Sequence, residues 1–204
     1  MEKSNIREPK QKRSIEKKNK IIEAGYLLFC EKGFYNTNTV EIAEKAGISV
    51  GTVYSYFEDK KAIFLEVLKY YSEKILMPMY AEFETLSMPL DLHEIISKII
   101  EISVQTHMFS EAAHEEMLAM SHSDKDVKKL THDFEEQVVL KFAEILCELG
   151  INIQNVNEKI HIIYNAVEFY SHEAAFHKHN FINYDVMREE IIKMIIKMIS
   201  DRGY

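Results

Sequence analysis

The chain has 204 residues, of which 47% are hydrophobic, 6 are Gly and 3 are Pro, and its formal net charge is −8. This composition excludes a disordered or collagen-like chain and favours a helical globule with one large domain or two small ones. No apolar run reaches the ~18–20 residues of a membrane span, and the start is charged without an apolar signal core, so we expect a soluble, cytoplasmic protein.

Charge is distributed unevenly along the chain. The first twenty residues hold eight Lys or Arg and three Glu, whereas the whole chain holds 25 Lys or Arg and 33 Asp or Glu. The asymmetry indicates a basic arm, disordered over residues 1–14, in front of an acidic body. The arm either contacts nucleic-acid phosphates or serves only as a solubilising tail.

Helical periodicity and capping residues predict the first elements. We expect a first helix over residues 14–32, closed by Gly33. Asn38 and Glu41 have the spacing of a capping box that opens a second helix. Gly47 stands where the chain must reverse, and Ser49 is suited to cap a third helix over residues 50–56.

The stretch 41–64 therefore predicts a helix-turn-helix. Val53 and Phe57, four positions apart, would form the buried face of its second helix. The other face shows small or hydroxylated groups and no carboxylate, which suits a helix that enters the major groove of DNA. Its residues are Val50, Gly51, Thr52, Ser55 and Tyr56.

Past residue 58 the pattern stays helical and shows no strand, so nine helices are predicted in all. A fourth helix should begin near Asp59 and end about Met77, where Pro78 stops or bends it. Asn155 and Glu158 read as a second capping box. The remaining helices are expected over residues 89–108, 110–120, 124–149, 155–178 and, from Asn183 or Asp185, to Ser200, with Ser110 capping the sixth.

Residues 33–64, GFYNTNTVEIAEKAGISVGTVYSYFEDKKAIF, resemble the DNA-binding segment of the TetR family of transcriptional regulators nearly position by position. The Gly-aromatic start, the Ala-Gly-Ile-Ser and Gly-Thr-Val-Tyr runs and the Lys opening the next helix stand in register. The resemblance covers about the first third of the chain. It implies an all-α fold, with a three-helix DNA-binding domain over residues 15–58 and an effector-binding and dimerisation domain over residues 59–204.

The same resemblance implies partners and contacts. The partners are a palindromic double-stranded DNA operator, a small-molecule effector and a second copy of the chain. Repression relieved by ligand is the common family behaviour, and nothing in these residues excludes activation. Thr39, Tyr54, Tyr56 and Lys60 would contact phosphates, and Ser49, Val50, Gly51, Thr52 and Ser55 would lie at or near the base edges.

The last two predicted helices are apolar on more than one side, so they lie deep in a core or pack against another chain. In a TetR-like protein they pair with their symmetry mates. The dimer contacts would then come from Ile163, Val167, Tyr170, Ala174, Ile192, Ile195 and Ile199.

Met and aromatic residues are dense in the body, which suits either an ordinary core or a pocket for an apolar or aromatic effector. Acids such as Glu115 and Glu116 would allow a cationic effector or lie on a solvated helix face. The candidate pocket residues are Tyr80, Phe83, Met108, Met117, Met120, Phe134, Tyr164 and Phe169.

Catalytic and metal-binding patterns are weak. His172, His177 and His179, with Glu173, form the tightest histidine group, but their spacing does not place them on one helix face, which predicts a polar rim. Cys30 and Cys147 lie far apart in apolar-periodic segments and are expected to be buried, reduced thiols. We therefore expect no enzyme, cofactor or metal. The alternatives are a ligand-binding protein with an inactive reading head and a metal- or redox-responsive regulator.

Overall fold

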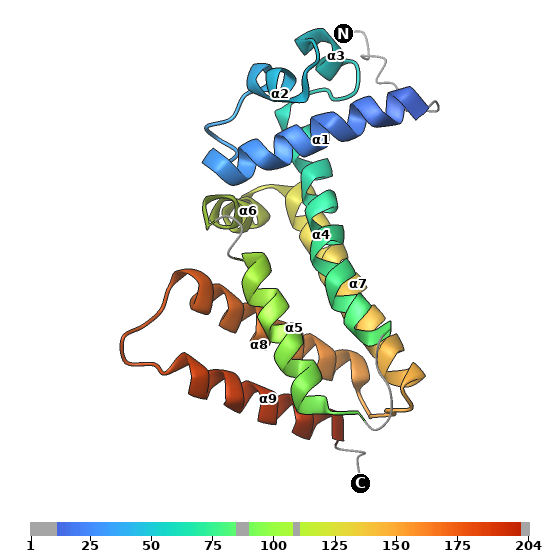
Figure 1. The fold of residues 1–204 in the computed structure, drawn as a ribbon, viewed down its shortest axis with the longest axis vertical. Helices are drawn as coiled ribbons and strands as arrows, with labels where there is room; N and C mark the ends of the chain where they lie inside the picture. The colour runs from blue at the N-terminus through green and yellow to red at the C-terminus, as the bar shows by residue number, and fades with distance from the viewer. Residues whose placement is uncertain (1–11, 85–89, 108–110, 201–204) are drawn as a thin grey trace. The chain divides into compact units, whose positions relative to one another are not determined.

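The computed structural model describes residues 12–84, 90–107 and 111–200, and within these ranges the chain forms nine helices and no strand (Figure 1). The predicted all-α class is confirmed. The helices are α1 (Lys12–Lys32), α2 (Thr39–Ala46), α3 (Val50–Tyr54), α4 (Lys60–Glu84), α5 (Leu92–His107), α6 (Glu111–Ser123), α7 (Lys125–Glu148), α8 (Val156–Phe176) and α9 (Tyr184–Ser200).

Two predictions about helix ends were wrong. Helix α4 continues to Glu84 rather than ending near Met77, since a proline costs a helix one backbone bond without always ending it. Asn155 has φ 52° and makes no side-chain cap bond, because the left-handed backbone does not aim its oxygen at the first helical amides. The predicted capping box at Asn155 is therefore absent.

The opening of the last helix matches its prediction. The side-chain oxygen of Asn183 accepts from the backbone N–H groups of Asp185, at 3.1 Å, and Val186, at 3.2 Å. Asn183 thus satisfies two amides that have no partner within α9. The predicted cap at Ser110 lies outside the described residues.

The chain divides into two compact units. The first contains residues 1–73 and 110–131, and the second contains residues 74–109 and 132–204, so the division falls within α4 and within α7. The predicted functional boundary after residue 58 stays a prediction.

The core of the first unit is built around three phenylalanine rings. Phe64 lies 5.4 Å from Phe29 and 4.8 Å from Phe34, measured between ring centroids. Met120 of α6 and Val127 of α7 are buried in the same cluster. Helix α6 packs on α1, so residues far along the chain complete the core beneath the helix-turn-helix.

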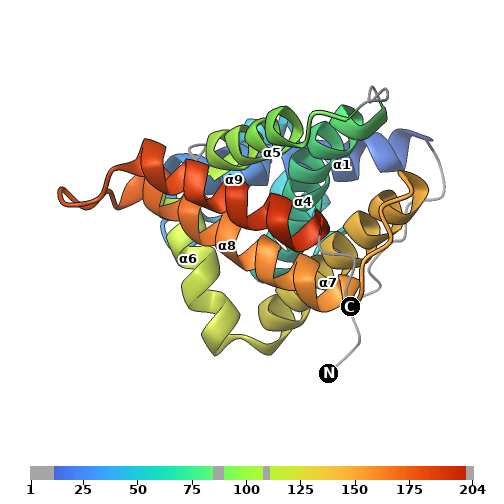
Figure 2. The same ribbon diagram turned by 90° about the horizontal axis from the view of Figure 1, so that it is seen from below.

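In the second unit, α5, α8 and α9 pack against one another (Figure 2). Ile100 and Ile192 are almost fully buried between them. A polar pair lies in this core, where the buried hydroxyl of Ser171 donates to that of Ser103 at 2.9 Å. Each buried oxygen thereby keeps a hydrogen-bond partner.

Among the described residues, none of the helices is both long and apolar enough to span a membrane. The cysteines differ from the expectation of burial, because Cys30 is half-buried and Cys147 is exposed on α7. The apolar residues near Cys147 in the sequence face the core, and the thiol lies on the other side of the helix.

Candidate nucleic-acid interface

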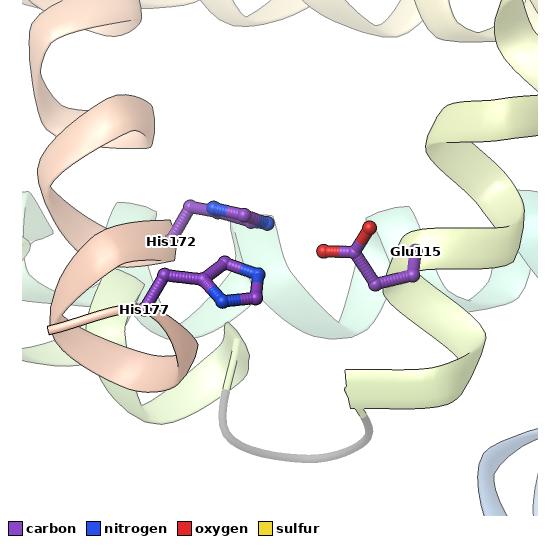
Figure 3. Close-up of side chains that lie close together, drawn as sticks. All are labelled: Glu115, His172 and His177. Atoms are coloured by element: carbon purple, nitrogen blue, oxygen red, sulfur yellow. The ribbon is translucent and has the colours of Figure 1, made fainter.

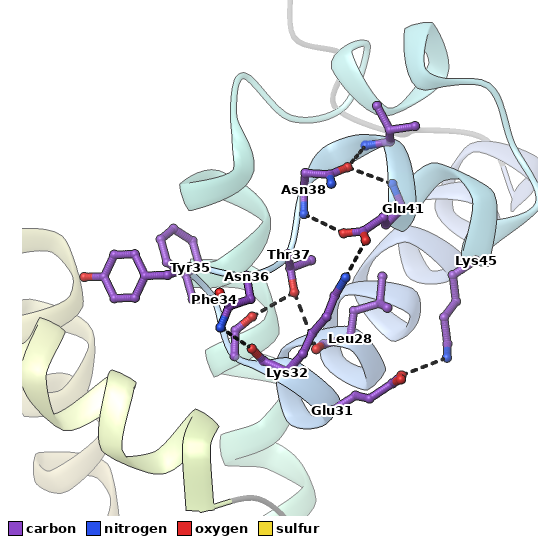
Figure 4. Close-up of polar contacts among 12 residues, drawn as sticks. Leu28, Glu31, Lys32, Phe34, Tyr35, Asn36, Thr37, Asn38, Glu41 and Lys45 are labelled. Carbon is purple, nitrogen blue, oxygen red and sulfur yellow. Dashed lines mark hydrogen bonds and ion pairs between the residues drawn. The ribbon is translucent and has the colours of Figure 1, made fainter.

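The capping box predicted at the start of α2 is confirmed (Figure 4). The side chain of Asn38 accepts from the N–H groups of Val40, at 3.0 Å, and Glu41, at 3.1 Å, and the Glu41 carboxylate accepts from the Asn38 N–H. Lys32, at the end of α1, forms an ion pair with Glu41. The hydrogen bond from Lys32 lowers the pKa of the Glu41 carboxyl, which favours its ionised form.

The turn between α2 and α3 depends on Gly47, which has φ 67°. Its N–H bonds to the carbonyl of Glu44, and the next N–H, of Ile48, returns to Ala43 at 3.0 Å. A left-handed residue closes a helix this way at little cost only when it is Gly. Ser49 then caps α3 by accepting from the Thr52 N–H at 3.2 Å. The turn is therefore fixed at its start by Gly47, which closes α2, and at its end by Ser49.

The outer face of α3 carries several of the predicted DNA contacts. Ser49, Gly51 and Tyr54 are exposed, while Val50 and Thr52 are half-buried. A Cβ added to Gly51 would meet no atom of the protein within 4 Å, so no internal contact requires a glycine there. No Asp or Glu occurs between residues 49 and 55. This face could approach an anionic surface closely.

Ser55 and Tyr56, two of the predicted DNA contacts, each have a hydrogen-bond partner inside the protein. The Ser55 hydroxyl donates to the Thr52 carbonyl at 2.7 Å. Tyr56 is 9% exposed, and its hydroxyl lies 2.8 Å from the Ser14 hydroxyl of α1. Their roles in DNA binding stay predictions.

Lys60, predicted to bind a phosphate, is half-buried against the loop that precedes α2. Its ammonium donates to the carbonyls of Phe34, at 2.6 Å, and Thr37, at 2.7 Å, and lies 4.2 Å from the centroid of the Phe34 ring. Burial lowers the pKa of Lys60, while Glu116 and Glu41 act in the opposite direction. Its phosphate contact stays a prediction.

Sequence reasoning missed Glu116 of α6 as part of this site. Its carboxylate accepts from the backbone N–H of Phe34, 82 positions earlier in the chain. A glutamate beside a second glutamate on a helical segment shows no pattern that predicts such a contact. The side chain joins the site only because α6 packs on α1.

This geometry agrees with the comparison with known families. The sequence pattern described as "Bacterial regulatory proteins, tetR family" matches residues 21–67, which include all of α2 and α3. Residues 21–67 thus carry the DNA-binding pattern of this family, and the resemblance predicted from the sequence is confirmed over that segment.

The curated proteins that this chain matches include proteins named as transcriptional regulators. It is 44% identical over 59 residues to the HTH-type regulator YuxN of Bacillus subtilis, a match covering 29% of this chain and 20% of YuxN. It is 32% identical over 111 residues to RutR of Escherichia coli, covering 54% of this chain and 52% of RutR. The chain spans about half or less of the curated relatives that it matches.

A solved structure shows the same fold. A protein from Saccharomonospora viridis, crystallised in complex with choline, is 18% identical to this chain. The likeness covers 90% of this chain and 96% of that one, with a TM-score of 0.64. The identity is low, so this likeness establishes the fold alone.

The predicted pocket residues belong to different units of the chain. Met120 is buried and Met117 half-buried in the core of the first unit. In the second unit, the rings of Tyr80 and Phe83 lie 6.0 Å and 5.4 Å from that of Phe142. Phe134 and Tyr164 are half-buried, Phe169 is exposed, and Met108 lies outside the described residues.

Most of the predicted dimer residues face the core of their own chain. Val167 is 7% exposed and packs within the second unit, where Ile163 and Ala174 are half-buried. The buried members are Val167, Tyr170, Ile192, Ile195 and Ile199. The exposed apolar residues of α8 are instead Ile162, at 52%, and Phe169, at 58%.

The histidines at the end of α8 differ from the prediction. The rings of His172 and His177 lie 5.1 Å apart between centroids, although the spacing of five does not suit one helix face (Figure 3). They approach because α8 ends at Phe176 and His177 leaves the helix with φ −130°. His179 lies 3.4 Å from Glu173. Glu115, also drawn, belongs to α6 and to the first unit.

Proposed function

We propose that the chain is a homodimeric transcription regulator that binds a palindromic DNA operator through α3. The observation that carries this proposal is the exposed, acid-free face of α3, where Gly51 has no packing role within the protein. A helix with such a face can lie close to base edges in the major groove. Ser49, Thr52 and Tyr54 would supply its hydroxyl groups.

Phosphate contacts would come from the groups around this face. Thr39 and Tyr54 present hydroxyl groups at the helix-turn-helix surface. Arg13, Lys17 and Lys20 are exposed on α1, and they carry the positive charge that the acidic body lacks. Contacts of this kind fix register on the duplex and make binding depend on salt.

A palindromic operator requires two reading heads about 34 Å apart, one helical turn of DNA. The second copy would pack on α8 and α9. Ile162 and Phe169 are seven positions apart on α8 and therefore on the same side of it, and both are exposed in the single chain. Covering them with the same face of a second copy would remove exposed apolar surface from water.

The regulating ligand would be a small apolar or aromatic molecule bound in the second unit. Tyr80, Phe83 and Phe142 gather three aromatic rings there. Aromatic faces also hold quaternary ammonium groups, and the relative from S. viridis was crystallised with choline. Ligand binding would lower operator affinity by roughly 5- to 150-fold, which corresponds to a coupling of about 1–3 kcal/mol. Release of repression is the expected consequence.

The test is selection of DNA by the purified protein. A library of random 40-bp duplexes is passed through repeated rounds of binding, and the enriched duplexes are sequenced. We expect an inverted repeat with half-site centres one helical turn apart. A variant with Thr52→Ala should lose preference at specific bases while keeping its salt dependence. Enrichment of no sequence would contradict the proposal and favour a ligand-binding protein with an inactive reading head.

A further inference from the structure

The loop of residues 33–37, here named the anchor loop, joins α1 to α2 and is held from two sides. From α4, Lys60 donates to the carbonyls of Phe34 and Thr37. From α6, Glu116 accepts from the N–H of Phe34. The loop therefore binds a cation through two carbonyl oxygens and an anion through one amide N–H. Each charge faces a backbone group of opposite partial charge.

Gly33, the first residue of the anchor loop, leaves space for the Glu116 carboxylate. Gly33 has φ +82°, a conformation that disfavours other residues. A Cβ at this position would lie 2.7 Å from Cδ of Glu116, a separation that Cβ atoms essentially never show. The missing side chain thus gives the carboxylate room to reach the neighbouring amide.

The anchor loop leads directly into the reading helices. The buried hydroxyl of Thr37 donates to the Gly33 carbonyl at 2.7 Å, which closes the loop on itself. The next residue, Asn38, caps α2. The hydroxyl of Thr39 lies 3.0 Å from the hydroxyl of Tyr54 on α3. A displacement of the loop would therefore move the start of α2 and, through it, α3.

We propose that Glu116 is a positioning residue that holds α2 and α3 in place for DNA binding. Helix α6 would then take part in the function of the DNA-binding domain. This inference rests on the proposed function. Glu116 would touch no DNA, and it acts by holding the anchor loop. The family pattern ends at residue 67, and thus the inference assigns a role in DNA binding to a residue well outside the matched segment.

The test compares Glu116→Ala, Glu116→Gln and a control, Glu111→Gln, which removes one charge from an exposed position on the same helix. Amide hydrogen exchange at Phe34 is measured without DNA. Affinity is measured for the duplex that the wild-type protein selects from the random 40-bp library, across a range of salt concentrations.

Glu116→Ala should speed exchange at the Phe34 amide by at least about tenfold, because a hydrogen bond to a charged acceptor is lost. It should weaken duplex binding by about five- to tenfold with an unchanged salt slope, since no phosphate contact is removed. Glu116→Gln keeps an acceptor oxygen and should recover most of both effects. Glu111→Gln should match the wild type.

Unchanged exchange at Phe34 in Glu116→Ala would overturn the proposal, and so would faster exchange with wild-type affinity. If Glu116→Ala does not fold, the same two outcomes are judged on Glu116→Leu, which also removes the acceptor but keeps a longer side chain, against Glu111→Gln. If the wild-type protein selects no duplex, the proposed function fails and the DNA role of Glu116 falls with it. The exchange result then still decides whether Glu116 holds the loop.

Discussion

The hydroxyl groups of Thr39 and Tyr54 lie 3.0 Å apart, which links the first turn of α2 to the last turn of α3. Tyr54 is 49% exposed, so the link lies at the surface of the helix-turn-helix. When two hydroxyl groups bond to each other, one O–H is used between them and the other stays free to donate, from a fixed position, to a phosphate. Such preorganisation lowers the entropy lost on binding.

Gly51→Ala should separate stability from DNA binding. The added Cβ meets nothing within the protein, and Ala is favoured over Gly in a helix by ~1 kcal/mol, so the free energy of unfolding should rise by about 0.5–1 kcal/mol. Affinity for the selected duplex should fall, because the methyl group stands between α3 and the groove. Chemical denaturation and fluorescence anisotropy measure the two quantities. Unchanged affinity would show that Gly51 is merely tolerated.

Lys60→Met tests whether this lysine holds the loop, binds phosphate or does both. Loss of its ammonium leaves the carbonyls of Phe34 and Thr37 without that donor, which should destabilise the fold by about 1–3 kcal/mol. A phosphate contact predicts, in addition, that the salt slope falls by about one unit. The control is Lys69→Met, at an exposed position of the same helix. Destabilisation with an unchanged slope would rule out the phosphate contact.

Charge substitutions on α8 should distinguish the outer face from the core. Phe169→Glu and Ile162→Glu alter exposed positions, so each should yield a folded monomer. Val167→Glu buries a charge in the core of the same chain and should cost several kcal/mol or prevent folding. Sedimentation velocity gives the oligomeric state, and thermal unfolding gives the stability. A folded dimer of Phe169→Glu would place the interface elsewhere.

The pair of His107 and Glu168 should make stability depend on pH. Burial favours the neutral ring, but the Glu168 carboxylate, whose oxygen lies 3.4 Å from Nε2, and the Ser103 carbonyl outweigh it, so the pKa of His107 is raised. Its stabilisation is complete below the unfolded pKa of about 6.5 and is lost as pH rises through the folded value.

Replacing the Glu168 carboxylate should therefore destabilise the fold more at acidic than at alkaline pH. The difference in unfolding free energy between the wild type and Glu168→Gln should be larger at pH 6 than at pH 8.5 by roughly 0.5–1 kcal/mol, since Glu168 is partly exposed and screened. Denaturant unfolding at the two pH values measures it. Glu158→Gln, exposed on the same helix, serves as the control. An equal or smaller difference at pH 6 would contradict the assigned pair.

The helix-turn-helix could be predicted from local sequence patterns alone. Asn38 and Glu41 cap α2, Gly47 turns the chain and Ser49 caps α3, and each of these interactions joins residues at most five positions apart. Short-range hydrogen bonds and backbone preferences leave a readable pattern because partner and spacing stand together in the chain. The failed cap at Asn155 shows the limit, since the same spacing gave no cap where the backbone is left-handed.

Contacts between residues that are far apart along the chain became known only from the packing of the helices. Helix α8 has two apolar sides, and packing against α5 and α9 put Val167 in the core and left Phe169 exposed. His172 met His177 because the helix ended between them. Glu116 reached Phe34 across 82 positions because α6 packs on α1. Such contacts depend on how helices pack in space. The spacing of residues along one helix does not specify which other helix it will contact.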